Sequence, residues 1–264
     1  MTSGIDPEVN AAAIVAAVGD AARSGAAMLF TPEMSGFLDR DRARAAATVR
    51  GEDADSVLAN TRRAARDHGI WIALGSLAID LGDGTRANRA FVIDPQGDIR
   101  ARYDKLHMFD VDLATGESWR ESNSYRAGAG ITTVADTPLG TLGLAICYDL
   151  RFPALFEALG RAHCDVIAIP AAFTVPTGEA HWHVLQRARA IEASAFVVAA
   201  AQVGEHEDGR RTYGHSLVVD PWGEVLLDMG GEAPGLGFAE IDPARIDEVR
   251  AQLPSLANRR EIAT

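Results

Sequence analysis

Three side chains at the ends of predicted strands have the chemistry of a nucleophilic site, and the first is the thiol of Cys147. The apolar segment 141–147 (TLGLAIC) ends on this cysteine, and Pro153 opens a helix shortly afterwards. A nucleophile at a strand-to-helix turn is exposed on a sharp elbow, as serine is in G-x-S-x-G hydrolases, and the helix N-terminus favours the thiolate. The alternative is a buried structural thiol, which is how we interpret Cys164 in its plain helix-to-strand link.

Glu33 and Lys105 are the second and third candidates. Glu33 follows a short apolar strand that Pro32 terminates, and a carboxylate at the carboxyl end of a strand stands where α/β proteins form their sites. Lys105 is the only lysine of the chain, and a protein that uses arginine for every other such cation has a reason to keep one compact ammonium. A solvated loop acid and an ordinary surface lysine are the alternatives, because spacing alone does not show that the three residues meet.

The elements that must position these residues follow from apolar periodicity and turn signals. Helices are expected at 7–22, 53–68, 153–162, 182–194 and 242–253, and single strands at 26–30, 71–79, 165–171, 195–203 and 237–241. Hairpins are expected at 86–103, 131–146 and 216–228, and a long, functional loop at 105–130.

The mixed order of strands and helices indicates an α/β fold. Residues 92–99 and 218–225 share the pattern V-[IV]-D-P-x-G-[DE]-[IV]. This repeat reflects either two good hairpin turns or two similar sheets folded from two halves of one domain. We expect one domain over 1–264, built as a four-layer α-β-β-α sandwich with two mixed sheets face to face and helices outside.

Composition excludes several classes of function. The chain has 264 residues, 47% of them hydrophobic, and a formal net charge of −12. An acidic surface repels nucleic acid and anionic membranes. We see no apolar run long enough to span a membrane and no signal peptide in the first residues, MTSGIDPEVN. Two cysteines cannot form a disulfide framework, so we expect reduced thiols and a cytoplasmic protein.

Three segments resemble the motifs of the nitrilase superfamily, the carbon–nitrogen hydrolases. They are FTPEMSGF around Glu33, YDKLHMFDVD around Lys105 and GLAICYDLRFP around Cys147. The resemblance continues through 171–194, 213–225 and 253–260, so it covers nearly the whole chain. Within the family, the branch of deaminated-glutathione amidases looks most similar, and the ω-amidases, which act on 2-oxo acid amides such as 2-oxoglutaramate, are a close second.

The resemblance implies hydrolysis of a small-molecule amide. Cys147 would attack the carbonyl and form a thioester, and Glu33 would carry protons between thiol, leaving amine and water. Lys105 and the backbone N–H of Tyr148 would hold the oxyanion. Glu121 matches a second glutamate of the family, and we expect it to orient Lys105 or the substrate.

Two further residues are candidates for the site. Arg151 is expected either to pair with a substrate carboxylate or to form a structural ion pair, and Thr174 is expected to contact substrate. His181 and His183 form an H-x-H without further ligand motifs, so we expect no metal. The glycines at 128–130 lack the third glycine of a dinucleotide loop, so no nucleotide cofactor is expected.

The resemblance also raises questions that it leaves open. Relatives begin with a core strand that should already have ended at Met1, so we expect Met1 to be an internal methionine of a longer native protein. Relatives commonly form dimers, which makes a homodimer the default. A non-catalytic interaction protein of the same fold and acyl transfer to an amine remain alternatives to hydrolysis.

Overall fold

The computed structural model describes residues 1–260 except 113, 115 and 117, and two β-sheets form its centre. The first sheet has the spatial order β1 (Met28–Phe30), β2 (Trp71–Asp80), β3 (Arg86–Ile93) and β4 (Ile99–Asp104). The second has the order β14 (Val225–Asp228), β13 (Leu217–Val219), β10 (Phe196–Ala199), β9 (Val166–Ala168), β8 (Gly140–Leu144) and β7 (Thr133–Thr137). Parallel pairs join β1 to β2 and β8, β9 and β10 to one another, whereas the other neighbours in these sheets are antiparallel.

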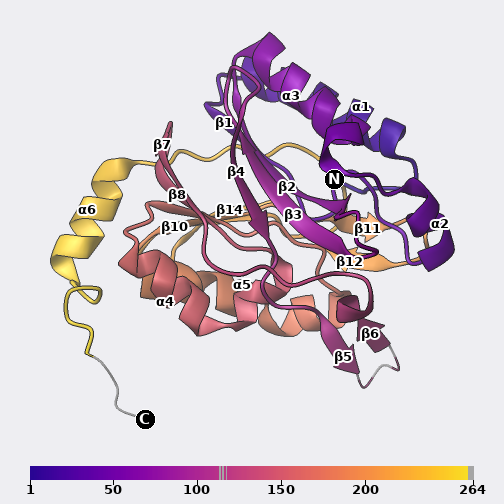
Figure 1. Ribbon diagram of the computed structural model, residues 1–264. Helices are drawn as coiled ribbons and strands as arrows, with labels where there is room; N and C mark the ends of the chain where they lie inside the picture. The colour runs from indigo at the N-terminus through magenta and orange to yellow at the C-terminus, as the bar shows by residue number, and fades with distance from the viewer. Residues whose placement is uncertain (113, 115, 117, 261–264) are drawn as a thin grey trace.

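Helices cover the outer faces of both sheets. Figure 1 shows α1 (Pro7–Arg23) and α3 (Ser56–His68) on the first sheet, and α4 (Pro153–Arg161) and α5 (Val175–Ala193) on the second. Two further helices, α2 (Arg42–Thr48) and α6 (Pro243–Gln252), lie at the periphery. Two small hairpins complete the fold: β5 (Asp110–Asp112) with β6 (Ser118–Arg120), and β11 (Val203–Glu205) with β12 (Arg211–Tyr213). The expected α-β-β-α sandwich is therefore confirmed.

The alternation of side chains along β2 and β3 explains how the first sheet packs against helices on one face and against the second sheet on the other. On β2, Ile72 and Leu74 pack among the side chains of α1 and α3, whereas Ala73 belongs to the core between the two sheets. On β3, Phe91 likewise faces the helices and Val92 faces the second sheet. Successive side chains of a strand point to opposite faces, so a continuous apolar run is buried on both sides.

Most expected elements are confirmed, and helix caps account for their ends. The side chain of Asp6 caps α1 and that of Asp55 caps α3, while Gly69 ends α3 in the left-handed conformation at φ +64°. We expected no α2, although Asp41 caps it. Helix α5 begins at Val175 rather than at Trp182, so its first two turns were missed.

The strand expected at 237–241 is wrong. This segment forms no ladder with any described residue, although Gly237 lies beside Leu227 and Met229. Gly237 within it and Gly235 just before it weaken strand formation. The hairpin of β11 and β12 was not expected, and β5 and β6 lie inside the expected loop at 105–130. The single domain over 1–264 and a core strand preceding the chain stay predictions.

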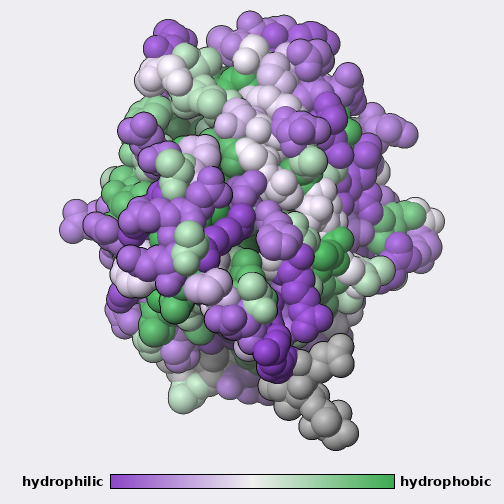
Figure 2. Space-filling view, turned by 90° about the vertical axis from the view of Figure 1, so that its left-hand side faces the viewer, coloured by the Kyte–Doolittle hydropathy of each residue, from purple (hydrophilic) through white to green (hydrophobic). Residues whose placement is uncertain are grey.

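The surface is largely hydrophilic on the face shown in Figure 2, where hydrophobic residues form small groups between polar ones. None of the helices in the described part of the chain combines the length and apolar character that a membrane crossing requires.

Candidate active site

The structure brings Glu33, Lys105 and Cys147 together, each placed just beyond the carboxyl end of a strand. Glu33 follows β1, Lys105 follows β4 directly, and Cys147 follows β8. The Lys105 ammonium lies 3.0 Å from Glu33 Oε1, and the Cys147 thiol interacts with the same carboxylate. Residues remote in sequence therefore meet at the edge shared by the two facing sheets.

The Glu33 carboxylate is buried and fully engaged. Its Oε1 accepts hydrogen bonds from Lys105 and from Asn88 Nδ2 at 2.9 Å, and its Oε2 accepts one from the Ala172 N–H at 2.9 Å. The carboxylate is thus held from both sheets. The side chain is only 6% exposed, so these donors replace water.

A glycine allows the chain to bring Glu33 to this place. A Cβ at Gly75 of β2 would lie 2.0 Å from the Thr31 carbonyl oxygen and 2.3 Å from that of Pro32. The Thr31 hydroxyl accepts a hydrogen bond from the Gly75 N–H at 3.0 Å. Because no other residue type fits so close to this backbone, the segment that ends in Glu33 depends on Gly75.

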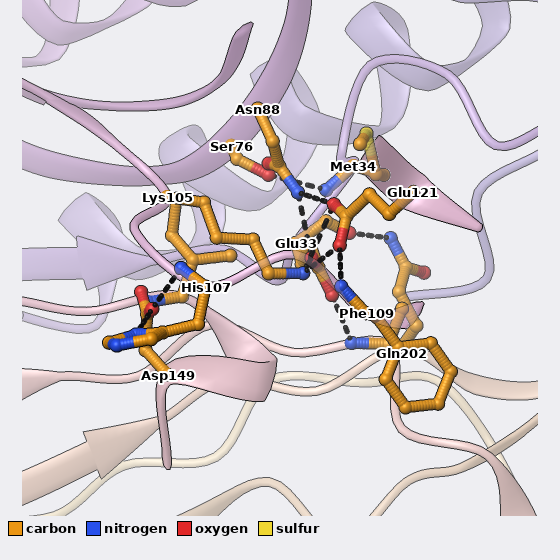
Figure 3. A network of polar contacts seen from close by, with 12 residues as sticks. Glu33, Met34, Ser76, Asn88, Lys105, His107, Phe109, Glu121, Asp149 and Gln202 are labelled. Atoms are coloured by element: carbon orange, nitrogen blue, oxygen red, sulfur yellow. Dashed lines mark hydrogen bonds and ion pairs between the residues drawn. The ribbon is translucent and has the colours of Figure 1, made fainter. Parts of the chain in front are cut away.

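Lys105 is held between two carboxylates. Figure 3 shows its ammonium near Glu33 and Glu121, and the Nζ atom lies 3.1 and 2.9 Å from the two oxygens of Glu121. Asn88 Nδ2 and the Phe109 N–H also donate to Glu121, at 3.1 and 2.7 Å. The expected contact of Glu121 with Lys105 is therefore present in the structure.

Cys147 occupies a strained turn. It has φ +49° and begins a short 3₁₀ helix, η3 (Cys147–Arg151). A left-handed conformation costs a non-glycine residue roughly 1–2 kcal/mol. The Cys147 N–H donates to the Pro170 carbonyl at 2.9 Å, which ties the turn to the segment after β9. The expected sharp turn at Cys147 is confirmed, but its expected exposure is not, because the residue is buried.

Electrostatics set opposite proton affinities for the acid and the thiol. Burial would raise the pKa of Glu33, but the charge of Lys105 and hydrogen bonds from Cys147, Lys105 and Asn88 outweigh it and lower this pKa. Burial and the Glu33 charge raise the pKa of the Cys147 thiol well above its usual range. At neutral pH the site therefore holds a thiol beside a carboxylate. Our expectation that the helix N-terminus favours the thiolate is wrong, because burial and Glu33 dominate.

The charge of Lys105 is secure. Burial alone would lower the pKa of its ammonium, but the charges of Glu121, Glu33 and Cys147 raise it well above the usual value. Lys105 is 2% exposed. It is therefore a permanent, desolvated cation beside the nucleophile, where an ion interacts most strongly with developing negative charge.

Asp149 is a positioning residue that the sequence analysis missed. Its buried carboxylate accepts hydrogen bonds from the Ile146 N–H at 2.9 Å, the Tyr103 hydroxyl at 2.7 Å and the His107 N–H at 3.0 Å. These contacts fix the backbone on both sides of the nucleophile. The available signal was an acid inside an otherwise apolar strand-to-helix turn. Asn88 was missed too, and its signal was an amide in a buried strand.

The three remaining expected residues surround the nucleophile. The Tyr148 N–H has no acceptor in the part of the chain that the structure describes. Arg151 lies over the rings of Tyr148 and Phe173, with its Cζ atom 5.8 and 5.4 Å from their centroids. In the described part of the chain its side chain lies 3.2 Å from His181 Nδ1, and both expected pairings, with a substrate carboxylate or in a structural ion pair, stay predictions. Thr174 caps α5 and bonds Thr177 through the two hydroxyls.

A pocket of about 210 Å³ opens onto these groups. Glu33, Lys105, Glu121 and Cys147 line it together with Tyr148, Arg151, Thr174, several aromatic residues and further arginines. Cys164, in contrast, is fully buried elsewhere in the core, where burial and then the charge of Asp165 raise its pKa to about 12. A small organic anion fits such a cavity better than a polymer.

A different histidine pair from the one in the sequence motif could hold a metal. His183, His215 and Asp228 place their donor atoms within 4.8 Å of one another, outside the pocket. His183 Nε2 and His215 Nδ1 lie 3.0 and 2.9 Å from the Asp228 carboxylate, so mutual hydrogen bonds also account for the cluster. His181 instead lies 3.2 Å from Arg151 and does not join them.

Comparisons with known proteins show which sequences this chain resembles. The family model described as Carbon-nitrogen hydrolase matches residues 2–251. A protein named deaminated glutathione amidase from Yersinia enterocolitica is 43% identical over 206 residues, which cover 77% of this chain and 71% of that protein.

Two solved structures show the same fold. The C. elegans NitFhit protein superposes with a TM-score of 0.88 at 40% identity over 98% of this chain, and the chain spans 63% of that longer protein. An amidase from Nesterenkonia sp. AN1, with acrylamide added at its active site cysteine, superposes with a TM-score of 0.79 at 27% identity. The match covers 96% of this chain and 95% of that one.

Proposed function

This chain belongs to the carbon–nitrogen hydrolase family, and from that premise we propose that it hydrolyses deaminated glutathione through a thioester on Cys147. One observation carries the proposal: a thiol, a carboxylate and a permanent cation meet in the lining of one pocket. The substrate is the amide of 2-oxoglutaric acid with cysteinylglycine. Hydrolysis would release those two compounds.

Acylation begins with proton transfer. Glu33, an anion at neutral pH, takes the proton of the Cys147 thiol as the sulfur attacks the amide carbonyl carbon. The tetrahedral oxyanion accepts hydrogen bonds from Lys105 and from the unpaired Tyr148 N–H. Because Lys105 already contacts both Glu33 and Glu121, it exchanges one contact with Glu121 for the oxyanion.

Collapse of this intermediate breaks the carbon–nitrogen bond. Glu33 returns its proton to the leaving nitrogen, and the amine departs while the acyl group stays on Cys147. A water molecule then gives a proton to Glu33 and attacks the thioester carbonyl. The carboxylic acid leaves as the thiol regains its proton, so atoms and charges balance over the cycle.

The substrate side of the proposal is supported by the pocket lining and by the name of the Yersinia enterocolitica relative. Arg151 lies close to the nucleophile without a carboxylate partner in the described chain, which suits the carboxylate of a 2-oxo acid. Thr174 also lines the pocket and is placed to contact the 2-oxo acid end of the substrate. An ω-amidase acting on 2-oxoglutaramate would use the same acyl group, so it is the second candidate.

The cellular setting is part of the proposal. Both cysteines are free, which supports the reducing cytoplasm. A homodimer is supported by exposed apolar side chains on α5 and on the neighbouring hairpin of β13 and β14, namely Val184, Ile191, Trp222, Val225 and Leu226. Light scattering on the purified protein tests the dimer, and Val184→Glu should weaken it.

A hydrolysis panel tests the function. We expect the order of preference to be deaminated glutathione, then 2-oxoglutaramate, with little activity on N-carbamoyl-β-alanine or a simple nitrile. Cys147→Ala should abolish turnover while the protein stays folded, and Cys164→Ala is the matched control that keeps it. Preference for the nitrile, or activity that survives Cys147→Ala, would refute the proposal. Products formed with an added amine separate hydrolysis from acyl transfer.

A further inference from the structure

The charge of the pocket is opposite to that of the chain. The formal net charge is −12, yet seven arginines and Lys105 line the cavity, against three carboxylates. Two of those carboxylates, Glu33 and Glu121, share the single positive charge of Lys105. A low-dielectric cavity with this surplus of cations concentrates anions with more than one negative charge.

Two of the lining arginines combine partial burial with the lack of a carboxylate partner within the described residues, and these are Arg86 and Arg151. The lining arginines Arg40, Arg42 and Arg211 also lack such a partner, but they are exposed. A partly desolvated guanidinium without a counterion is the group that gains most from a bound carboxylate.

Arg86 lies on the same side of the pocket as Glu33. It begins β3, two residues before Asn88 on the same face of the strand, and thus about 7 Å from it. Asn88 donates to Glu33 and to Glu121. Tyr125 forms a bridge with Arg86. Burial and the charge of Glu121 raise the pKa of Tyr125 to about 12, against the opposing charge of Arg86.

Arg151 approaches from the other sheet. It ends η3, four residues after the nucleophile, and contacts rings beside Cys147. The acyl group remains bound to Cys147, so Arg151 is placed for the acyl end of the substrate. The leaving nitrogen must face Glu33 to receive its proton, and the rest of the leaving group then extends along the pocket toward Arg86.

We propose that Arg86 forms a second carboxylate-binding subsite, which holds the carboxylate of the leaving group. This inference rests on the proposed function and narrows its substrate class to amides that carry a carboxylate on each side of the scissile bond. A further unused donor lies in the same pocket. Trp119 Nε1 is buried and has no partner among the described residues, so it can donate to a peptide carbonyl of the leaving group.

The test compares a substrate that has the distal carboxylate with one that lacks it. Deaminated glutathione loses a dipeptide with a carboxylate, whereas 2-oxoglutaramate loses only ammonia. For Arg86→Ala we expect the ratio of kcat/KM for deaminated glutathione to that for 2-oxoglutaramate to fall about 10- to 100-fold, mainly through KM. Arg86→Lys should restore part of the ratio. Arg126→Ala removes a neighbouring arginine that pairs with Asp83 outside the pocket, and it should leave the ratio unchanged.

Binding separates this proposal from the proposed function. Calorimetry with deaminated glutathione uses the Cys147→Ala protein, with and without Arg86→Ala, and needs no turnover. We expect Arg86→Ala to weaken binding at least 10-fold. Equal binding by both proteins, no binding by either, or an equal loss of activity on both substrates would overturn the subsite. A wild-type protein that binds but does not hydrolyse deaminated glutathione, with binding that depends on Arg86, would overturn only the proposed function.

Discussion

Glu121 holds the Lys105 ammonium with both of its carboxylate oxygens, at 3.1 and 2.9 Å from Nζ, and we therefore expect it to be the main anchor of the proposed oxyanion donor. It also accepts hydrogen bonds from Asn88 and Phe109, so that three segments of the chain meet on one carboxylate. The Glu121 side chain is only 13% exposed. Its geometry is that of a residue acting through another rather than on the substrate.

Glu121→Gln should therefore lower kcat more than it changes KM. The amide keeps the shape but gives Lys105 only one good acceptor and loses a charge beside a buried cation. We expect kcat to fall about 10²- to 10³-fold, which is the range for losing one oxyanion donor. Steady-state kinetics give the measurement. An increase in KM alone would show that Glu121 serves substrate binding instead, and Ser122→Ala next to it is a matched surface control.

The pH profile follows from the two opposite pKa shifts. Glu33 has a pKa below its ordinary value of 4.5, so the base stays ionised, and kcat/KM should fall only as the pH drops through that lowered value. The Cys147 thiol has a pKa well above 9.0, which moves any alkaline change beyond that pH. Between these two pKa values we expect kcat/KM to stay constant, as measured with a substrate that does not titrate in that range. An acid limb centred near pH 6 would contradict this arrangement.

The lowered pKa of Glu33 also affects the stability of the fold at low pH. A carboxyl group whose pKa is lower in the folded state than in the unfolded state stabilises the fold above its unfolded pKa, and this contribution is lost as the pH falls through the folded value. For Glu33 the window lies below 4.5. Compared with the wild type, Glu33→Gln should show a shallower fall in the free energy of unfolding across that window, as measured by denaturant titration. Identical slopes would assign acid unfolding to other groups.

Thiol labelling distinguishes the two cysteines. Iodoacetamide should alkylate Cys147 in the folded protein because the pocket admits it and Glu33 can accept the proton. Cys164 is fully buried, with a pKa raised to about 12, and should remain unlabelled. Peptide mass spectrometry locates the adduct. Glu33→Gln should slow labelling of Cys147, and equal rates in both proteins would show that the thiol does not need this base.

Gly75→Ala should lower stability and activity by displacing the segment that carries Glu33. The added methyl group would lie 2.0 Å from the Thr31 carbonyl oxygen, so the segment that carries Glu33 must move. We expect a loss of about 1–3 kcal/mol in the free energy of unfolding, as for other overpacked sites, and a larger proportional loss in kcat. Gly130→Ala, at a position with no positive φ and with open space around it, is the control for adding a methyl group without a clash. Unchanged kcat in Gly75→Ala would show that Glu33 is placed independently of this contact.

Metal removal should leave hydrolysis intact. The mechanism uses only a thiol, a carboxylate and an ammonium, and the cluster of His183, His215 and Asp228 lies outside the pocket. After dialysis against EDTA we expect the same kcat and the same melting temperature. A fall in either that zinc restores, and that His183→Ala reproduces, would establish a metal role for this cluster.

The three reactive residues of the site could be identified largely from the sequence, because the type of a residue and the strand or turn around it are local properties. An apolar strand ending on Cys147, a strand ending near Glu33 and a lone lysine after a hairpin are each visible without coordinates. The helices with clear caps, such as α1 and α3, were located for the same reason. The strand expected at 237–241 failed because pairing needs a partner edge, which periodicity does not reveal.

The amino-acid sequence by itself determined the fold class, the layers and the reactive groups, since alternation, caps and residue chemistry act over a few neighbouring positions. Only the tertiary structure decided that Asn88 and the Ala172 N–H hold Glu33, that Asp149 fixes the turn at Cys147, and that Arg86 faces the pocket. It also decided the direction of the Cys147 pKa, because burial and a carboxylate from another strand outweigh the adjacent helix end. These effects depend on distances between segments that are remote in the chain, and such distances exist only once the two sheets have packed.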